Sequence, residues 1–340
     1  MPISMGEVVV AGSGAGGLAA ALAIARQRHR VLVLGDSDPF VPPDAGVHLT
    51  PGVLRALDRI GVGLDARDRA ATVGRVHVVD GVTGQPITTM PAASRHGRPH
   101  AVVRGRDLLE LLRRRCRTDP AIRLREDASV VGYEQSDERL TVRLSTGERL
   151  AADALVGADG VCSQVRLRLT GATRRTSPYA TFHTTFPADR MPVPPASPFT
   201  DRASVTLWAG PDWQLVRYPA GEDRVGVAAN CPHDADTLVP GARVPGSQVL
   251  LRLPGLTESA QELVSLGTDW RMWVPCDPAP LTRWHDRRVV LTGAAVRPAF
   301  LCAFPAALQA VDDAVRLADV MDCDAADFPE AFRSYAVHRV

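Results

Sequence analysis

Apolar and polar positions along the chain first predict an alternation of buried strands and helices. Residues 7–11 and 31–34 are short, mainly apolar runs, typical of strands buried on both faces of a parallel sheet. Between them, the Ala- and Leu-rich stretch 15–28 predicts a helix that follows a Gly-rich turn. This β-α-β order predicts a parallel sheet with a crossover helix.

The same character returns near the end of the chain. Residues 288–293 form another apolar strand pattern, and 306–321 has the period of a strongly amphipathic helix. A short helix is predicted over 328–338. Two further helices are predicted at 51–60, which opens with Pro and is followed by Gly61, and at 106–116.

The middle of the chain is different, because polar and apolar residues there alternate with the period of strands. Residues 122–157 predict a small antiparallel layer that ends in a buried strand, 153–157. Residues 173–280 hold four of the five tryptophans and show no long helical period, which predicts a mostly β domain. We therefore expect an α/β protein with a Rossmann-type domain (parallel sheet plus helices) over 1–72, 101–172 and 276–340, and an inserted β-rich substrate domain over 73–100 and 173–275.

Composition narrows the function classes. With 39 basic and 38 acidic residues, the chain has no charge excess that would favour nucleic acid or an anionic membrane as a partner. Every basic residue is Arg, so a Schiff-base lysine and a P-loop lysine are excluded. The six cysteines form no CxxC pair and no zinc spacing, so we expect no metal and buried free thiols in a cytoplasmic protein. The apolar run 8–25 lacks a basic flank and is interrupted by glycines, which argues against a leader peptide.

The turn after the first strand fits the pattern GxGxxG, with Gly12, Gly14 and Gly17. In such a turn the first glycine permits a tight bend, the second lets the backbone approach a diphosphate, and the third lets helix and strand pack closely. The free N–H groups at the helix start favour phosphate. The acid expected at the end of the second strand is replaced by Gly35, and Asp36 should point to the other side.

A second motif, 153-DALVGADGVCSQVR-166, together with the first resembles the flavoprotein aromatic hydroxylases, the single-component FAD monooxygenases of the salicylate-hydroxylase and zeaxanthin-epoxidase type. The resemblance covers most of the chain and is weakest over about 173–275. It implies that Asp159 and Gly160 lie under the cofactor and serve FAD and NAD(P)H binding. It also implies a cofactor-contacting Arg, for which Arg104 or Arg106 is the candidate.

The family's third fingerprint is present at 291–314, but its cofactor contacts differ. The Asp that binds the ribityl chain of FAD falls on Ala294, and the Asn falls on Leu308. The Gly-x-Gly that gives the flavin ring access to backbone falls on Phe304-Pro305-Ala306. A lost charge-assisted hydrogen bond costs about 1.5–3 kcal/mol, and the bulk of Phe304 and Pro305 adds a steric obstacle. We expect FAD, the cofactor implied by the resemblance, to be lost or weakly bound.

Each candidate site residue has two interpretations, one functional and one structural. His183 is either an acid or base facing a substrate cavity or a satisfied structural histidine. Arg297 is either a solvated loop residue or a clamp for an anion or carbonyl. Six aromatic residues either pack in the core or line a pocket for an apolar small-molecule substrate. They are Trp208, Trp213, Tyr218, Trp273, Phe300 and Phe304.

Three functions follow from the resemblance, which implies a scaffold with relatives in polyketide pathways, and from the departures just described. The first is a redox-neutral enzyme on the hydroxylase scaffold, which cyclises or rearranges an apolar polyketide-type intermediate by holding it in a reactive conformation. The second is an FAD- and NAD(P)H-dependent monooxygenase that hydroxylates or epoxidises an aromatic or polyketide substrate. The third is a non-catalytic binding protein. The first function predicts turnover without a change in mass, and the second predicts NAD(P)H consumption that depends on FAD. The third predicts ligand binding without turnover.

Overall fold

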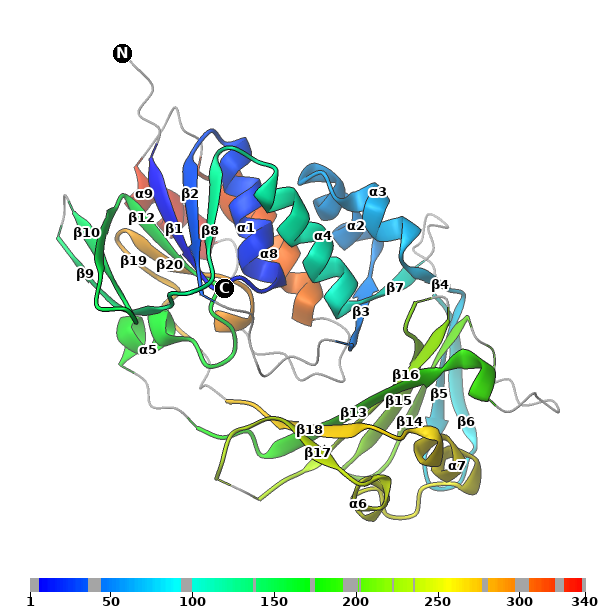
Figure 1. The fold of residues 1–340 in the computed structure, drawn as a ribbon. Helices are drawn as coiled ribbons and strands as arrows, with labels where there is room; N and C mark the ends of the chain where they lie inside the picture. The colour runs from blue at the N-terminus through cyan, green and yellow to red at the C-terminus, as the bar shows by residue number, and fades with distance from the viewer. Residues whose placement is uncertain are drawn as a thin grey trace.

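The chain folds into an α/β unit and a β-rich unit that lies beside it (Figure 1). The computed structural model describes residues 6–35, 44–92, 100–136, 139–171, 175–191, 201, 203–221, 223–234, 236–276, 281–296, 306–321 and 327–337.

A six-stranded sheet forms the centre of the α/β unit within these residues. Its neighbouring strands pair in parallel, except for the antiparallel edge strand at His285–Asp286. The central strands are apolar and fully buried, because helices cover one face and a second layer covers the other. The order across this parallel sheet is β19 (His285–Asp286), β20 (Val289–Leu291), β12 (Ala154–Gly157), β1 (Glu7–Ala11), β2 (Arg30–Leu34) and β8 (Ile122–Arg125).

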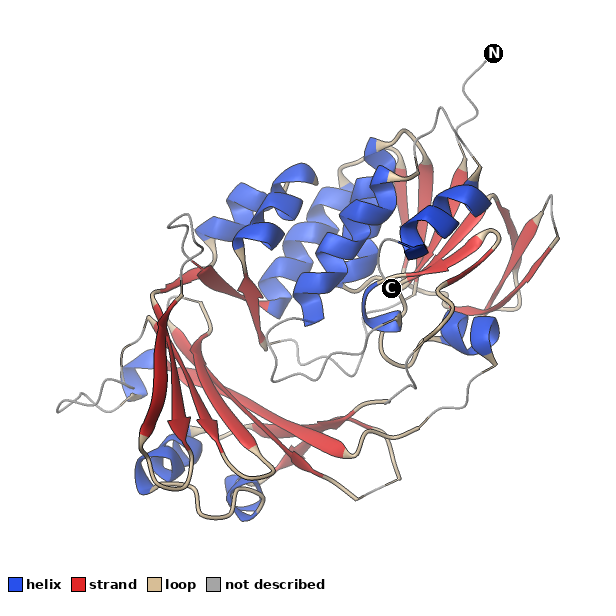
Figure 2. Ribbon diagram, turned by 180° about the vertical axis from the view of Figure 1, so that it is seen from behind, coloured by secondary structure: helices blue, strands red, loops and turns tan. Residues whose placement is uncertain are grey.

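The helices on one face are α1 (Ala15–Arg26), α2 (Pro51–Arg59), α3 (Gly63–Asp68), α4 (Gly105–Arg117) and α8 (Ala306–Asp319), seen from behind in Figure 2. The other face carries an antiparallel layer of β9 (Val130–Gln135), β10 (Leu140–Leu144) and β11 (Arg149–Ala152), with α5 (Gln164–Thr170) beside it. The final helix, α9 (Phe328–Val337), packs near β19 and β20. Helix α2 begins where the sequence predicts, because Thr50 Oγ1 accepts a hydrogen bond from the Val53 amide at 3.3 Å and Pro51 needs no donor.

The described strands of the β-rich unit form one large eight-stranded sheet. Neighbouring strands are antiparallel except β5 and β14, which pair in parallel. Helices α6 (Gly246–Leu251) and α7 (Glu258–Leu266) cover its outer face, away from the α/β unit (Figure 1). The order across this large sheet is β17 (Val239–Val244), β18 (Trp270–Val274), β13 (Tyr179–Pro187), β16 (Arg224–Pro232), β15 (Gln214–Pro219), β14 (Ser204–Ala209), β5 (Arg75–Asp80) and β6 (Pro86–Pro91).

A small sheet lies between the two units at the β14–β5 end of the large sheet. Its described strands are β3 (Gly46–Leu49), β7 (His100–Arg104) and β4 (Ala71–Val73). One face of the small sheet packs on the helices through Leu49 and Val103, and the other packs on the large sheet through Val73 and Val102. It therefore joins the two cores.

The α/β class and its parallel sheet are confirmed, and two local expectations were wrong, one for residues 122–125 and one for the cysteines. Residues 122–125 join the parallel sheet as β8, and their alternating pattern arises because β8 is an edge strand with only one covered side. The β-rich stretch includes the short helices α6 and α7. Cys162 and Cys276 are joined in a disulfide, with Cα atoms 5.5 Å apart, whereas all six cysteines had been expected as free thiols. Cys116 and Cys231 are buried free thiols.

Trp270 tests the packing of α7 on the outer face of the large sheet. Its side chain is 1% exposed, and its indole N–H donates to the Val264 carbonyl at 3.0 Å. We expect Trp270→Ala to lower the free energy of unfolding by about 3–5 kcal/mol, measured by urea denaturation, because it opens a cavity and removes one of the hydrogen bonds to that carbonyl. Leu251→Ala is the matched control, since Leu251 is 83% exposed and should change stability by less than about 0.5 kcal/mol. Equal losses in both variants would contradict this packing.

Candidate functional site

Three loops leave the parallel sheet side by side at its carboxyl edge. Ala11, Gly157 and Leu291 are the last residues of β1, β12 and β20, and they stand next to one another in register. β1 and β12 also flank the point where the strand order reverses, because the chain runs from β1 to β2 and β8 before it returns to β12. Open α/β sheets bind ligands at this kind of edge. The three sequence motifs therefore meet at one place.

The Gly-rich loop has the shape that a diphosphate requires. Gly12 has φ +102°, and a Cβ added there would lie 2.4 Å from the Ala158 carbonyl oxygen. A Cβ on Gly17 would lie 1.9 Å from the Gly12 oxygen, so this glycine permits the contact between α1 and the loop. A Cβ on Gly14 would meet nothing within 4 Å. The backbone at Gly14 is thus open to a ligand, at a helix start that carries no side-chain cap.

Ser13 adds a hydroxyl group to this loop, beside the open backbone. Its side chain is 1% exposed, and its Oγ has no hydrogen-bond partner among the described residues. Buried hydroxyls without a partner are uncommon, and a bound phosphate would supply one. The open backbone, the free helix N–H groups and this hydroxyl fit the diphosphate of a dinucleotide.

The Asp-Gly loop is held rigidly by its own hydrogen bonds. The Asp159 carboxylate accepts from the Ser163 hydroxyl and from the backbone N–H groups of Gln164 and Val165, at 2.7 and 3.1 Å for the two amides. It therefore caps the start of α5. Burial raises the pKa of Asp159 above its ordinary value, and these hydrogen bonds oppose that rise.

Arg166 connects this loop to the third one, and the sequence analysis did not single it out. Its guanidinium is 3% exposed and donates to the Val161 carbonyl and, at 2.8 Å, to the Ala295 carbonyl. A buried cation that donates to carbonyls of both loops fixes their spacing. Its place in the second motif was visible in the sequence, but its partner lies 129 residues away and could not be inferred locally.

The third loop fits the expected cofactor less well. Gly293 has φ +59° and Ala295 is buried, which shapes a tight turn after β20. Ala294, between them, is partly exposed and offers a methyl group where the resemblance places a ribityl-binding carboxylate. Arg297, Phe300, Phe304 and Pro305 lie outside the described residues, as does the Leu308 side chain. The described part of the site therefore fits the diphosphate end of FAD and lacks the acid for the ribityl chain.

The ribose side of the site also lacks an acid where one was expected. Gly35 directly follows β2 with φ +97°, and its amide donates to the Arg125 carbonyl at 3.2 Å. Asp36 lies outside the described residues. Arg104 forms an ion pair with Asp107 at 2.6 Å, which raises the pKa of its guanidinium, and Arg106 pairs with Asp44. Both candidate cofactor arginines thus have carboxylate partners.

The inner face of the large sheet, which is the face without α6 and α7, carries a polar network. His183 Nε2 lies 2.7 Å from the Tyr218 hydroxyl, which accepts a hydrogen bond from the Gly46 amide at 3.1 Å. Because that oxygen already accepts, its proton is available to His183 Nε2. Gly46 belongs to the small sheet, so the network crosses between the units. Thr181 Oγ1 donates to Asn230 Oδ1 at 2.6 Å on the same face.

His183 is buried and uncharged in this network. Its side chain is 4% exposed, and burial lowers its pKa to about 4. The geometry gives it a satisfied structural role. A neutral imidazole beside a tyrosine hydroxyl is also able to exchange a proton with it.

Of the six residues predicted to line a pocket, the four that the structure describes fall on two different faces of the large sheet. Tyr218 and Trp273 lie on the inner face with His183, whose ring centroid is 6.3 Å from each of theirs. Trp208 and Trp213 belong instead to the outer core under α6 and α7, and Trp213 Nε1 donates to the Pro254 carbonyl. Aromatic composition could not separate the two faces, because that depends on strand register. Phe300 and Phe304 lie outside the described residues.

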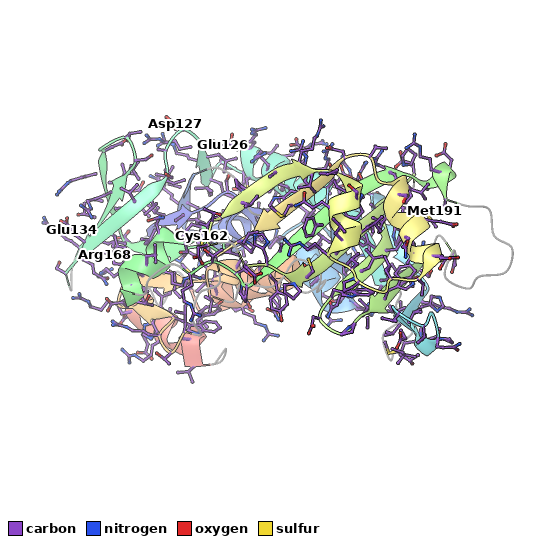
Figure 3. All side chains as sticks on the ribbon, turned by 90° about the horizontal axis from the view of Figure 1, so that it is seen from below. Glu126, Asp127, Glu134, Cys162, Arg168 and Met191 are labelled. Carbon is purple, nitrogen blue, oxygen red and sulfur yellow. A yellow bond between two sulfur atoms is a disulfide. The ribbon has the colours of Figure 1, made fainter. Side chains whose placement is uncertain are left out.

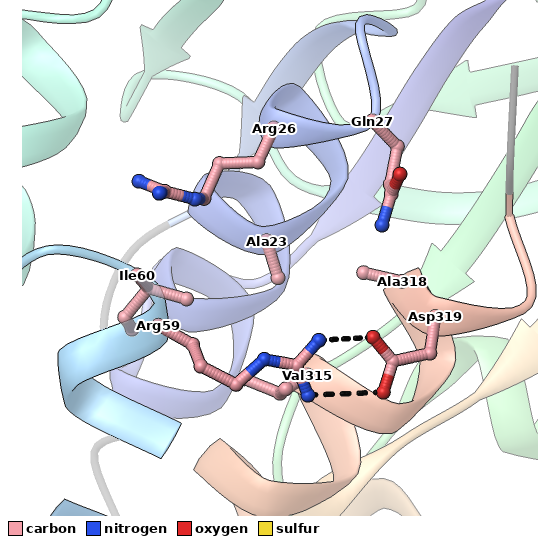
Figure 4. Close-up of a pocket in the computed structure, with 8 residues that line it drawn as sticks. All are labelled: Ala23, Arg26, Gln27, Arg59, Ile60, Val315, Ala318 and Asp319. Carbon is pink, nitrogen blue, oxygen red and sulfur yellow. Dashed lines mark hydrogen bonds and ion pairs between the residues drawn. The ribbon is translucent and has the colours of Figure 1, made fainter. Parts of the chain in front are cut away.

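A recess elsewhere on the α/β unit is unrelated to this site. It lies between the carboxyl-terminal parts of α1, α2 and α8, and the guanidinium of Arg59 closes one side by binding both carboxylate oxygens of Asp319 (Figure 4). The Gly-rich loop is at the opposite end of α1, so this recess has no access to the three loops.

Comparison with known proteins now identifies the class of protein. The family model "FAD binding domain" matches residues 5–216. The chain is 32% identical to 3-hydroxybenzoate 6-hydroxylase 1 of Aquipseudomonas alcaligenes over 92% of its length and 79% of the relative. It is 31% identical to 3-hydroxybenzoate 6-hydroxylase of Klebsiella oxytoca, over 98% and 84% of the two chains. The chain belongs to the FAD-binding flavoprotein aromatic hydroxylases, whose relatives named here are monooxygenases.

Solved structures agree with this assignment at the level of the fold. A salicylate hydroxylase in complex with substrate has a TM-score of 0.82 at 19% identity, over 98% of this chain and 84% of that one. HpxO of Klebsiella pneumoniae, complexed with FAD and uric acid, has a TM-score of 0.79 at 21% identity, over 97% and 82%. Across the described ranges, no helix has both the length and the apolar composition that crossing a bilayer requires. A cytoplasmic location stays a prediction.

The three glycines of the loop should respond differently to a methyl group. Gly12→Ala and Gly17→Ala should lower the free energy of unfolding by about 2–4 kcal/mol, because each Cβ would strike backbone. Gly14→Ala should change it by less than about 0.5 kcal/mol, because the backbone there is extended and the space is open. Urea denaturation of the ligand-free proteins measures all three. A loss at Gly14 like that at Gly17 would show that the loop is closed to a ligand.

His183 should make the protein sensitive to acid. Its folded pKa of about 4 lies below the ordinary 6.5, so between these values the unfolded chain binds the proton and the folded protein does not. The unfolding free energy should therefore fall as pH decreases through this window, by up to about 1.4 kcal/mol per pH unit from this residue. His183→Gln should have a shallower slope when denaturation is measured at pH 7, 6 and 5. Identical slopes would show that His183 is charged or exposed when folded.

Proposed function

We propose that the protein is an FAD- and NAD(P)H-dependent monooxygenase that hydroxylates a ring-hydroxylated aromatic carboxylic acid. The observation that carries this proposal is the intact diphosphate cradle at the meeting point of the three loops, with Gly14 open and α1 uncapped. The relatives support the reaction type.

The substrate class rests on what the relatives act on. Their names specify 3-hydroxybenzoate, 3-amino-4-hydroxybenzoate and 6-hydroxynicotinate, each an aromatic ring with a carboxylate and a hydroxyl group. The inner face of the large sheet offers aromatic and hydrogen-bonding side chains in Trp273, Tyr218 and Asn230. A planar, polar ring suits that mixture.

The chain's own residues would divide the work as follows. When bound, FAD would accept hydride from NAD(P)H and activate oxygen for transfer to the ring. The Gly12–Gly14 backbone and the start of α1 would hold its diphosphate, and the Asp159 loop would be kept in place by Arg166. The inner face of the large sheet would cover the substrate and exclude water. Tyr218 would orient a ring hydroxyl, with His183 as the group that shares its proton.

A second function is favoured by Ala294. Without the ribityl-binding acid, and with Phe304-Pro305-Ala306 in the chain where the family has Gly-x-Gly, the site would hold FAD weakly or not at all. The scaffold would then perform a redox-neutral cyclisation or rearrangement of an apolar polyketide-type intermediate, by holding the substrate in a reactive conformation. This alternative requires turnover without FAD, NAD(P)H or a change in mass.

The affinity of the protein for FAD distinguishes the two functions. The variant Ala294→Asp, which restores the acid, tests whether Ala294 limits that affinity. If the ligand-free protein is titrated with FAD and the quenching of flavin fluorescence is followed, the monooxygenase proposal predicts measurable binding. Restoring the acid should tighten it about 10- to 100-fold, since a charge-assisted hydrogen bond contributes about 1.5–3 kcal/mol. Gly14→Ala is the control and should weaken binding at unchanged stability.

The results of the FAD titration and of the activity assay decide between the two functions. Binding in the wild type, together with NADH oxidation that depends on both FAD and 3-hydroxybenzoate or 3-amino-4-hydroxybenzoate, would support the first function. If neither the wild type nor Ala294→Asp retains FAD, the monooxygenase proposal fails, and candidate substrates should be screened for isomeric products.

A further inference from the structure

The disulfide joins the candidate site to the end of the β-rich unit. Cys162 lies in the Asp-Gly loop, two residues after Gly160 and directly before Ser163, the cap of α5. Cys276 lies 114 residues later, just after β18. Figure 3 labels Cys162 where the two units meet. One covalent bond thus links a loop that binds the dinucleotide, by family resemblance, to the sheet that faces it.

Neighbouring chain passages connect the units at two places. At the small sheet, backbone hydrogen bonds continue from one unit to the other, because the Ala92 amide donates to the Gly74 carbonyl and the His100 amide to Ala92. At the other place, residues 175–178 run beside 275–276. In the described backbone, these two segments are paired by one isolated β-bridge, between Thr176 and Cys276. Its hydrogen bond runs from the Ser177 amide to the Pro275 carbonyl. The disulfide fastens this second connection to the Asp-Gly loop.

The four described cysteines differ in their exposure. Cys276 is 2% exposed, while Cys162 is partly exposed and is the sulfur that a small thiol would reach first. Cys116 and Cys231 are buried, and burial raises their thiol pKa to about 12 and about 11, so they stay protonated and unreactive near neutral pH. Among these four cysteines, Cys162 and Cys276 are therefore the pair that can react with a small thiol or disulfide.

We propose that Cys162 and Cys276 are a thiol–disulfide modification site whose oxidised form fastens the β-rich unit to the Asp-Gly loop. The oxidant is a low-molecular-weight disulfide of the glutathione type. The Cys162 thiolate attacks it and releases one small thiol, and the Cys276 thiolate then displaces the second from the mixed disulfide on Cys162. One small disulfide is reduced to two thiols, and two protein thiols are oxidised. Disulfides in a reducing compartment are usually of this reversible kind.

The first test follows stability in the absence of FAD, so its result does not depend on the proposed function. The full-length protein is equilibrated with glutathione disulfide or with dithiothreitol, desalted, blocked with an alkylating reagent and mapped by peptide mass spectrometry. We expect a linked peptide pair containing 162 and 276 only after oxidation, and a Tm higher by about 5–10 °C than in the reduced protein. Cys162→Ser and Cys276→Ser should abolish this redox response, while Cys116→Ser should keep it. The quantity compared between variants is the difference in Tm between the oxidised and reduced protein. A variant that is less stable overall is therefore still informative.

The second test uses the difference in exposure. With glutathione disulfide, folded Cys276→Ser should accumulate a mixed disulfide on Cys162, whereas in folded Cys162→Ser the buried Cys276 should stay unmodified. The proposal is overturned if 162 and 276 remain thiols under the oxidising condition, if either cysteine pairs elsewhere, if equal modification occurs in both variants, or if the disulfide forms without a change in Tm.

Discussion

The register of the parallel sheet is the constraint on which the site depends. Ala11, Gly157 and Leu291 end their strands in line, and the amides that follow continue the pairing, from Ala158 to Ala11 and from Thr292 to Gly157. Because the loops start so close together, their shapes are coupled. The carbonyl of Ala158 occupies the space that a side chain at Gly12 would need. A one-residue slip of any of these strands would separate the three motifs.

This constraint explains why the scaffold and its cofactor chemistry can diverge. The residues that shape the loops are glycines in contact with backbone and the buried Arg166, and their replacement would disturb the fold. Ala294 is partly exposed, so a change of side chain there is expected to disturb folding less than a change at the buried glycines or at Arg166. The features that show the family are therefore residues that hold the loops together, whereas weakened FAD binding at Ala294 is part of the proposal above.

Sequence reasoning succeeded where structure is determined locally. The β-α-β opening, the start of α2 at Pro51 and the helix α8 follow from periodicity and capping within a short window. It failed where the partner is distant in the chain. The contact of Tyr218 with Gly46 spans 172 residues and the disulfide spans 114, and neither leaves a local pattern. The faces of Trp208 and Tyr218 likewise depend on strand register, which composition does not encode.

The two units are held to each other by unequal means, and this bears on how such an enzyme would work. At the small sheet, the buried Tyr218–Gly46 contact and continuous backbone hydrogen bonds make a rigid connection. At the opposite place, the described backbone pairing is sparse and a covalent bond takes its role. Under the proposed function, a substrate held between the loops and the inner face would enter and leave past one of these connections. When Cys162 and Cys276 are reduced, as we propose, this second connection keeps only its sparse backbone pairing, so opening there would break few hydrogen bonds.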